Sequence, residues 1–361
     1  MLAVSACGNN GTALRGKAAD RSTEETESSG AATLKFNTNG EFRIVQFTDL
    51  HFNLQKKESI IVLKRIAEVI KAEKPDLVVV TGDIIYSHPA EATLRKIISH
   101  IDSCGAPFCA VLGNHDPDFD IPKEEFMHII RSYPNCVIPS DSPDYVLEVK
   151  SSAYPANNAA LLYMFDSNAH LFAENGRFIG YDSIHPQQVE WYRQTSSSYA
   201  ADGTDPDDTG ADSRGAGSHP LPALAFMHIP LPEYRLAACS DNSPLIGTRL
   251  ESVCSPVENT GLFEAFKQQG DVFACFAGHD HDNDYAAKWD DILLAYGRYT
   301  GGNTEYNDLP NGARVIVLKE GLRSLDSYII VKGGEKLNRI TFPDSFTYTE
   351  WRTRPLDPEC L

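Results

Sequence analysis

The stretch FRIVQFTDLHF, residues 42–52, joins an apolar run to an acid and an imidazole that follow it directly. A run of this kind is typical of a strand that is covered on both faces of its sheet, where polar groups are disfavoured. Asp49 and His51 therefore stand just beyond the end of a predicted strand. These two side chains are therefore expected to serve something other than packing of the core.

The following segments alternate between helical and strand-like patterns. Apolar residues at helical spacing predict helices over residues 60–71 and 90–101. Short β-branched runs predict strands over residues 76–80 and 107–112. This order is that of βα units around a largely parallel sheet, which makes the expected fold class α/β.

Polar side chains follow the predicted strands at the points where those strands end. Two later apolar runs, residues 222–227 and 271–277, repeat the arrangement seen in the first three strands. Ligand sites in open α/β sheets form at the carboxyl ends of strands, so we expect these side chains to converge. The side chains concerned are Asp49, His51, Asp83, Asn114, His115, Asp116, His228, His279 and His281.

Carboxylate and imidazole groups in this combination are typical ligands of Mn, Fe or Zn. Two such ions about 3.5 to 4 Å apart polarise a phosphoryl oxygen and lower the pKa of a bound water toward about 7. The sequence contains no CxxC pair, so a thiolate zinc cluster is not expected. The residues indicate two-metal hydrolysis, with two divalent or trivalent ions as cofactors.

In chain order, the blocks DLH, GD, GNHD, the strand-ending His228 and GHDH resemble those of the calcineurin-like metallophosphoesterase superfamily. The resemblance covers roughly residues 41–330, and the stretches HIPLPEY, GHDHDNDY and AYGRYTG look closest to the purple-acid-phosphatase-like branch. It implies a layered α/β/β/α sandwich with the active site at the carboxyl ends of the strands. It also implies a binuclear metal-dependent phosphoester hydrolase.

Carried over to this chain, the resemblance implies two ligand sets that share one bridging carboxylate. The first set is Asp49, His51, Asp83 and His281. The second set is Asp83, Asn114, His228 and His279. A hydroxide between the metals would attack phosphorus, and His115 would face the substrate and assist the leaving oxygen. Asp116 would orient the His115 ring.

Two further residues are candidates for contact with the substrate. Tyr86 stands where the purple enzymes have a tyrosine that binds ferric iron, but His51 already fills that coordination position. A packed or pocket-lining aromatic ring is therefore favoured over a ligand at Tyr86. Arg298, in the stretch YGRYTG, is a candidate for a two-pronged contact with phosphate, and a structural ion pair is the alternative.

Charge limits the classes of partner. The chain has 361 residues, of which 32 are basic and 50 acidic, and its formal charge of −18 repels nucleic acid and anionic membranes. We therefore expect a small phosphoester as substrate and no nucleic acid as partner. The sequence has no apolar run of about 18 residues, so membrane attachment would require a lipid anchor.

The two ends of the chain differ from its body. The stretch VSACG, residues 4–8, resembles the processing site of bacterial lipoproteins, in which the cysteine is acylated, here Cys7. We expect a tether over residues 1–40, a catalytic domain over residues 41–335 and a packed C-terminal strap over residues 336–361. The expected location is the cell envelope, and an exposed cysteine in a cytosolic tail is the alternative. In an oxidising compartment, a disulfide between Cys239 and Cys254 is also an open possibility.

The expected activity is that of a phosphatase acting on small phosphomonoesters. A phosphodiesterase acting on cyclic nucleotides, nucleic acids or phospholipid head groups would use the same metals. The non-enzyme alternative is a metal-dependent binding protein. His115 favours an enzyme, because a site that only binds has no need of this extra imidazole.

Overall fold

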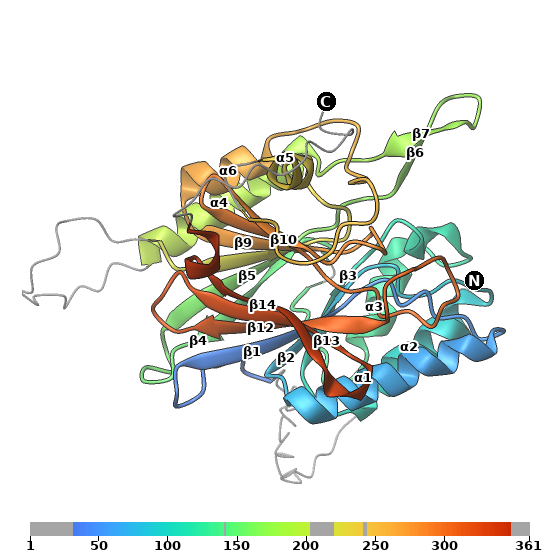
Figure 1. Cartoon of the computed structure of the whole chain (residues 1–361), viewed down its shortest axis with the longest axis horizontal. Helices are drawn as coiled ribbons and strands as arrows, with labels where there is room; N and C mark the ends of the chain where they lie inside the picture. The colour runs from blue at the N-terminus through green and yellow to red at the C-terminus, as the bar shows by residue number, and fades with distance from the viewer. Residues whose placement is uncertain (1–31, 141, 203–219, 241–243, 348–361) are drawn as a thin grey trace, which may run out of the picture. The chain divides into compact units, whose positions relative to one another are not determined.

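The computed structural model describes residues 32–140, 142–202, 220–240 and 244–347. Within these residues the chain forms two six-stranded sheets and a separate two-stranded hairpin (Figure 1). Helices cover the outer face of each sheet, and a shared apolar core fills the space between the sheets. The predicted α/β/β/α sandwich is confirmed.

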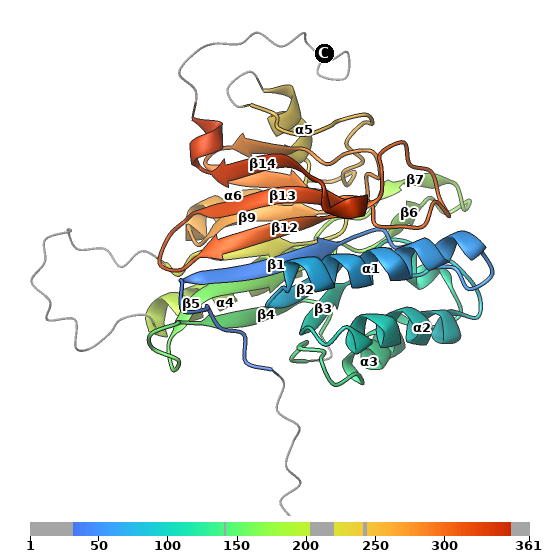
Figure 2. The same ribbon diagram turned by 60° about the horizontal axis from the view of Figure 1, so that its bottom comes forward.

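The first sheet contains the N-terminal βα units and has the strand order β14-β13-β12-β1-β2-β3. Strands β1, β2 and β3 are parallel, whereas β12 to β14 continue the sheet in antiparallel pairs. Its strands are β1 (Glu41–Phe47), β2 (Leu77–Thr81), β3 (Phe108–Val111), β12 (Gly312–Lys319), β13 (Leu325–Val331) and β14 (Lys336–Phe342). Figure 2 shows three helices beside β1, β2 and β3, namely α1 (Ile60–Glu73), α2 (Ala90–Ser103) and α3 (Lys123–Arg131).

The second sheet has the strand order β10-β11-β9-β8-β5-β4, with parallel pairing from β5 through β8 and β9 to β11. Its strands are β4 (Tyr145–Lys150), β5 (Asn158–Met164), β8 (Ala223–Phe226), β9 (Val272–Ala277), β10 (Ala286–Trp289) and β11 (Ile292–Tyr296). The helices on its outer face are α4 (Pro186–Asp202), α5 (Glu233–Cys239) and α6 (Leu262–Gln269).

Strand β8 shows why the predicted strands are apolar on both faces. Leu224 and Phe226 belong to the core between the sheets, whereas Ala223 and Ala225 belong to the core under the outer helices. Successive side chains of a strand point to opposite faces, so a strand with two covered faces must be apolar throughout. Full burial of a side chain such as Leu or Phe contributes about 1.5–3 kcal/mol.

The remaining elements are short. The separate hairpin consists of β6 (His170–Phe172) and β7 (Phe178–Tyr181). Single turns of 3₁₀-helix occur at η1 (Lys57–Ser59), η2 (Asp116–Asp118), η3 (Lys332–Gly334) and η4 (Asp344–Phe346). In the described residues, no helix is both long and apolar enough to span a bilayer.

The structure shifts the predicted domain boundaries at both ends. Leu34 and Phe36 are buried, and the backbone of this segment exchanges two hydrogen bonds with Lys150, so the last residues assigned to the tether belong to the fold. Likewise, residues 336–342, predicted as part of a strap, form the edge strand β14. Cys7 and the rest of residues 1–31 lie outside the described residues.

The structure does not contain the disulfide between Cys239 and Cys254 that the sequence left open. Cys239 is disulfide-bonded, but Cys254 keeps its thiol, whose sulfur donates to the backbone carbonyl of Ser252 at 3.6 Å.

Candidate metal centre

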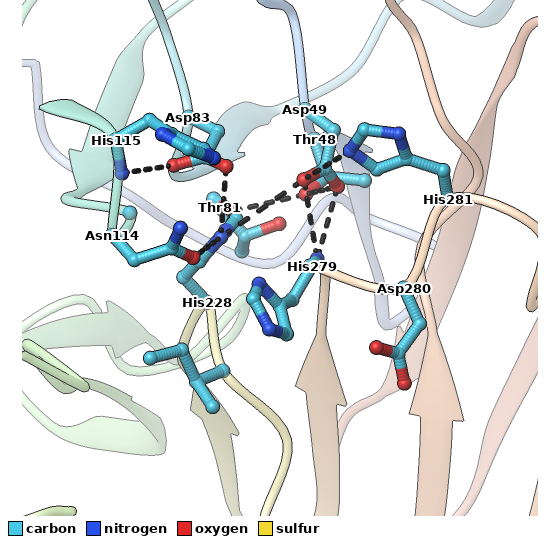
Figure 3. Close-up of polar contacts among 12 residues, drawn as sticks. Thr48, Asp49, Thr81, Asp83, Asn114, His115, His228, His279, Asp280 and His281 are labelled. Carbon is cyan, nitrogen blue, oxygen red and sulfur yellow. Dashed lines mark hydrogen bonds and ion pairs between the residues drawn. The ribbon is translucent and has the colours of Figure 1, made fainter. Parts of the chain in front are cut away.

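Five strands from both sheets deliver side chains to one place. Strands β1, β2 and β3 of the first sheet and β8 and β9 of the second sheet each end just before a predicted ligand. Figure 3 shows Asp83 and Asn114 on one side, Asp49 and His281 on the other, and His228 and His279 between them. All seven predicted ligands are buried.

The buried ligands form two groups, each close enough for a single ion. In each group one potential ligand atom per residue lies within 4.8 Å of the others. The first group is Asp49, His51 and His281. The second group is Asp83, His228 and His279. This division matches the two predicted sets.

Asp83 lies between the two groups, as a bridging carboxylate must. Its Oδ2 is 3.5 Å from Nε2 of His51 and 3.3 Å from Nε2 of His228. Asn114 completes the second set, with its Oδ1 at 3.0 Å from the same His228 nitrogen. Asp49 also approaches both groups, with its Oδ1 3.6 Å from Nε2 of His281 and 4.0 Å from Nε2 of His228, but both distances are longer than those of Asp83.

The hydrogen bonds of the imidazoles leave lone pairs that face one another. Nδ1 of His228 donates to the carbonyl of Thr81 at 2.8 Å, and Nδ1 of His281 donates to the carbonyl of Tyr306 at 2.7 Å. In the neutral form, Nε2 of each ring is then an acceptor. Nε2 of His228 faces two oxygen acceptors, and Nε2 of His281 lies 3.1 Å from Nε2 of His51.

Acceptors crowded in this way are satisfied only when a proton or a metal cation lies between them. In addition, His51 Nδ1 and His279 Nε2 are buried and have no hydrogen-bond partner among the described residues. An unpaired buried polar atom is costly unless a ligand satisfies it. The donor set therefore fits two metal ions of the Mn, Fe or Zn type.

The protonation states of the imidazoles also suit metal binding. Burial lowers the pKa of His51 and of His279 well below the usual value. Both rings are therefore neutral at pH 7, which is the form that binds metals. Burial also acts to lower the pKa of His228, but the negative charges of Asp83 and Asp49 outweigh it and raise that pKa to about 10. In the absence of metal, a proton on His228 takes the place of a cation.

The backbone is strained at the ligands. Asp49, His51, Asp83 and His279 have φ values of 53°, 39°, 50° and 78°. Such left-handed conformations are unfavourable for residues other than glycine and cluster at functional sites. Gly82, with φ of 80°, packs so closely that a Cβ there would lie 2.5 Å from Nδ1 of His228. The ligand loops are thus held in positions that the local backbone does not prefer.

Asp116 is not the partner of the His115 ring, and this prediction is wrong. Its carboxylate points inward and accepts hydrogen bonds from the backbone N–H groups of Gly113 and Ile84, both at 2.8 Å. Asp116 therefore ties the loop after β2 to the loop after β3. The ring of His115 instead pairs through Nδ1 with Oδ2 of Asp118, at 2.7 Å.

His115 lies beside the metal ligands without belonging to either group. Its backbone N–H donates to Oδ1 of Asp83 at 2.9 Å, and its side chain is 29% exposed. When Nδ1–H donates to Asp118, Nε2 remains available to a bound molecule. The Tyr86 ring stands 5.2 Å from the His115 ring and 5.3 Å from the His51 ring, so it packs beside the site.

Comparison with known proteins agrees with this geometry. The family model described as calcineurin-like phosphoesterase matches residues 42–283. The chain belongs to the calcineurin-like phosphoesterase family. In this chain the two ligand groups adjoin one another at Asp83, and His115 stands beside them.

Curated relatives within the family include the probable inactive purple acid phosphatases 14 and 29 of Arabidopsis thaliana, both 29% identical to this chain. The matches cover 74% and 73% of this chain, and 72% and 73% of the relatives. The phosphatase DCR2 of Saccharomyces cerevisiae is also 29% identical, over 74% of this chain and 49% of its own length.

Solved structures share the fold. A dimetal phosphatase from Danio rerio has a TM-score of 0.54 at 13% identity, with coverage of 83% of this chain and 98% of the other. Purple acid phosphatase PPD1 from yellow lupin has a TM-score of 0.50 at 11% identity, with coverage of 87% of this chain and 54% of the other.

Arg298 takes the structural role rather than the role of a phosphate contact. Its side chain is 2% exposed, and its guanidinium forms an ion pair with Asp284 and donates to the carbonyl of Pro310 at 3.2 Å. A buried charge needs such a partner, so the guanidinium is not available to a substrate.

His170 is a site residue that the sequence reading missed. Its Nε2 accepts a hydrogen bond from Nδ2 of Asn114 at 3.2 Å, and its ring lies 5.0 Å from the ring of His115. This contact turns Oδ1 of Asn114 toward His228. In sequence, His170 lies far from the ligand blocks, in a short strand with no metal motif. The only signal in the sequence was that the residue is a histidine.

Proposed function

We propose that this chain is a two-metal phosphoester hydrolase that acts on small phosphomonoesters. The observation that carries the proposal is the convergence of seven buried ligands on two adjoining groups around Asp83, with His115 beside them. A purely structural metal site is closed by protein ligands, whereas here a further, partly exposed imidazole borders the site.

Each residue has a definite task in this reaction. Two cations in such a site supply a water that is deprotonated near pH 7 and polarise the phosphoryl oxygens. The seven ligands would hold these cations, and Thr81 and Tyr306 fix the tautomers of His228 and His281 through their carbonyl groups.

His115 acts on the leaving oxygen. In its charged form it donates a proton from Nε2 to that oxygen, while Nδ1–H remains bonded to Asp118. The Asp118 carboxylate holds the ring in one orientation and stabilises its positive charge. In this hydrolysis the P–O bond to the alcohol breaks, the oxygen of water forms the new P–O bond, and the alcohol leaves with the proton from His115.

Metal-dependent binding without turnover is the second candidate, because the Arabidopsis relatives carry the description "probable inactive". A phosphodiesterase activity would use the same metals. Parallel assays with a nitrophenyl phosphomonoester and a bis-nitrophenyl phosphodiester separate the three. Each assay is run on metal-free protein and on protein loaded with Mn, Fe or Zn.

The proposal requires metal-dependent release of nitrophenol, faster from the monoester than from the diester. The reverse preference would make the protein a phosphodiesterase. Full occupancy by metals with no hydrolysis of either ester would leave only a binding function.

We also propose that Cys7 is acylated and anchors the chain to the cell envelope, on the support of the sequence around it alone. Detergent partitioning of the full chain tests this. The parent protein should enter the detergent phase and a Cys7→Ser variant the aqueous phase; equal partitioning of the two would reject the anchor.

A further inference from the structure

The β6–β7 hairpin lies apart from both sheets (Figure 1) and presents two pairs of aromatic residues. In the inner pair His170 is opposite Tyr181, and in the outer pair Phe172 is opposite Phe178. Neither strand carries a metal ligand. The side chains of the hairpin nevertheless extend from the metal centre to the solvent.

The inner pair fixes the hairpin against the second ligand group. His170 accepts the hydrogen bond from Asn114, and the Tyr181 ring packs edge-on against the His279 ring at 4.3 Å. Both Asn114 and His279 belong to the same predicted metal set. The hairpin is therefore held at a defined position beside the reacting centre.

The outer pair offers apolar surface that the fold itself does not use. Phe172 is 59% exposed and Phe178 is 46% exposed, with ring centroids 6.1 Å apart. The Phe172 ring lies 5.9 Å from the His170 ring, and the Phe178 ring lies 5.4 Å from the Tyr181 ring. Exposed aromatic rings that continue a buried site are typical of ligand-binding surfaces.

A second aromatic pair also adjoins His115. The Tyr86 ring stands 5.2 Å from the His115 ring and 5.8 Å from the Phe119 ring. His115 thus contacts aromatic rings both from the hairpin, through His170, and from the loop after β2, through Tyr86. An organic group bound beside His115 would have these rings as neighbours.

We propose that the β6–β7 hairpin determines specificity by binding the organic group of the substrate against Phe172 and Phe178. The preferred substrates are phosphomonoesters whose alcohol carries a flat apolar group, such as aryl phosphates. Aromatic rings stack on such groups, whereas a small polar alcohol such as glycerol gains little from them. This inference rests on the proposed phosphatase function.

The test compares an aryl ester with a polar ester in matched variants. The metal-loaded parent, Phe172→Ser and Phe178→Ser are assayed for kcat/KM with 2-naphthyl phosphate and with glycerol phosphate. Both phenylalanines are largely exposed, so the variants keep the core. Leu322→Ser serves as control, because Leu322 is 57% exposed in the turn between β12 and β13, at the far end of the sheet from the ligands.

Each phenylalanine variant should lose roughly tenfold in kcat/KM for the naphthyl ester and little for the glycerol ester, since one apolar contact discriminates by about this factor. The control should change neither value. Equal losses for both esters, or no loss for the naphthyl ester, would overturn the role of the hairpin.

A binding arm separates this inference from the proposed function. Calorimetry on the metal-loaded protein compares 2-naphthylmethylphosphonate with methylphosphonate, neither of which is hydrolysed. The naphthyl compound should bind more tightly to the parent, and the difference should vanish in Phe172→Ser. Equal binding of the two compounds to the parent overturns the inference even if the protein is an active phosphatase. Failure of the parent to hydrolyse any ester would reject the phosphatase function. The calorimetric comparison of the two phosphonates would still decide whether the hairpin binds the apolar group.

Discussion

Asp83 is the residue on which both ligand groups depend. Its Oδ2 approaches imidazoles of both groups, so an Asp83→Ala variant should lose both metals and all hydrolysis. Metal content is measured by elemental analysis after gel filtration. Asp118→Asn is the matched control, because its carboxylate lies near the site without belonging to either group. Two metals retained per chain in Asp83→Ala would exclude a bridging role.

His115 and Asp118 should affect turnover without affecting metal content. His115→Ala removes the proton donor and should lower kcat by roughly 10² to 10⁴, the usual contribution of a proton-transfer group. Asp118→Asn keeps a hydrogen-bond acceptor but removes the charge, so its loss should be smaller and should shift the pH profile of kcat. Identical pH profiles for Asp118→Asn and the parent would contradict the pairing with His115.

At the scale of elements, close packing of the ligand loops can be tested at two glycines with similar backbone. Gly82 has φ of 80° and is crowded by His228, whereas Gly105 has φ of 76° and open space around it. Substitution by Ala at Gly105 should cost about 1 kcal/mol from backbone strain. At Gly82 the added clash should make the loss larger and should reduce metal content.

Thermal unfolding of both variants measures the difference. A Gly82→Ala protein with the stability of Gly105→Ala and full metal content would show that the loops adapt to the extra methyl group.

The elements themselves were predictable because their signals are local. Strands with two covered faces produce unbroken apolar runs, and the ends of the four elements predicted over residues 60–112 differ from the prediction by at most two residues. The ligands followed from their position after those runs and from their resemblance to a family. Both kinds of signal are carried by a few neighbouring residues.

What the sequence could not indicate depends on contacts across the fold or on short turns. Asp116 is adjacent to His115 in sequence, but the single turn η2 directs the Asp116 carboxylate inward and returns Asp118 to the ring. His170 meets Asn114 across 56 residues. The Arg298 guanidinium is neutralised by Asp284, and nothing in YGRYTG distinguishes this from a phosphate contact.

At the scale of the whole molecule, the candidate metal ligands come from both sheets. Asp49, Asp83 and Asn114 follow strands of the first sheet, whereas His228 and His279 follow strands of the second. Ions that bind only the folded state stabilise it, by about 4 kcal/mol at a thousandfold excess over Kd. Removal of the metals by a chelator should therefore lower the unfolding temperature.

Binding of metal ions at this site should also release protons. In the metal-free protein the pKa of His228 is raised to about 10, so the ring carries a proton at pH 7 that a metal must displace. Lowering the pH favours the proton, so metal affinity should fall. Calorimetry in two buffers of different ionisation enthalpy counts the protons released. Uptake without proton release, or affinity independent of pH, would contradict a protonated His228.

The pairing of β1 has a consequence for how the protein is made. One neighbour of β1 is β2, but the other is β12, and Glu41 pairs with Lys319 near the opposite end of the chain. During synthesis, one edge of β1 therefore stays without its partner until β12 has left the ribosome. An unpaired edge readily joins strands of other chains. Premature stops before β12 should accordingly yield aggregates rather than smaller folded proteins.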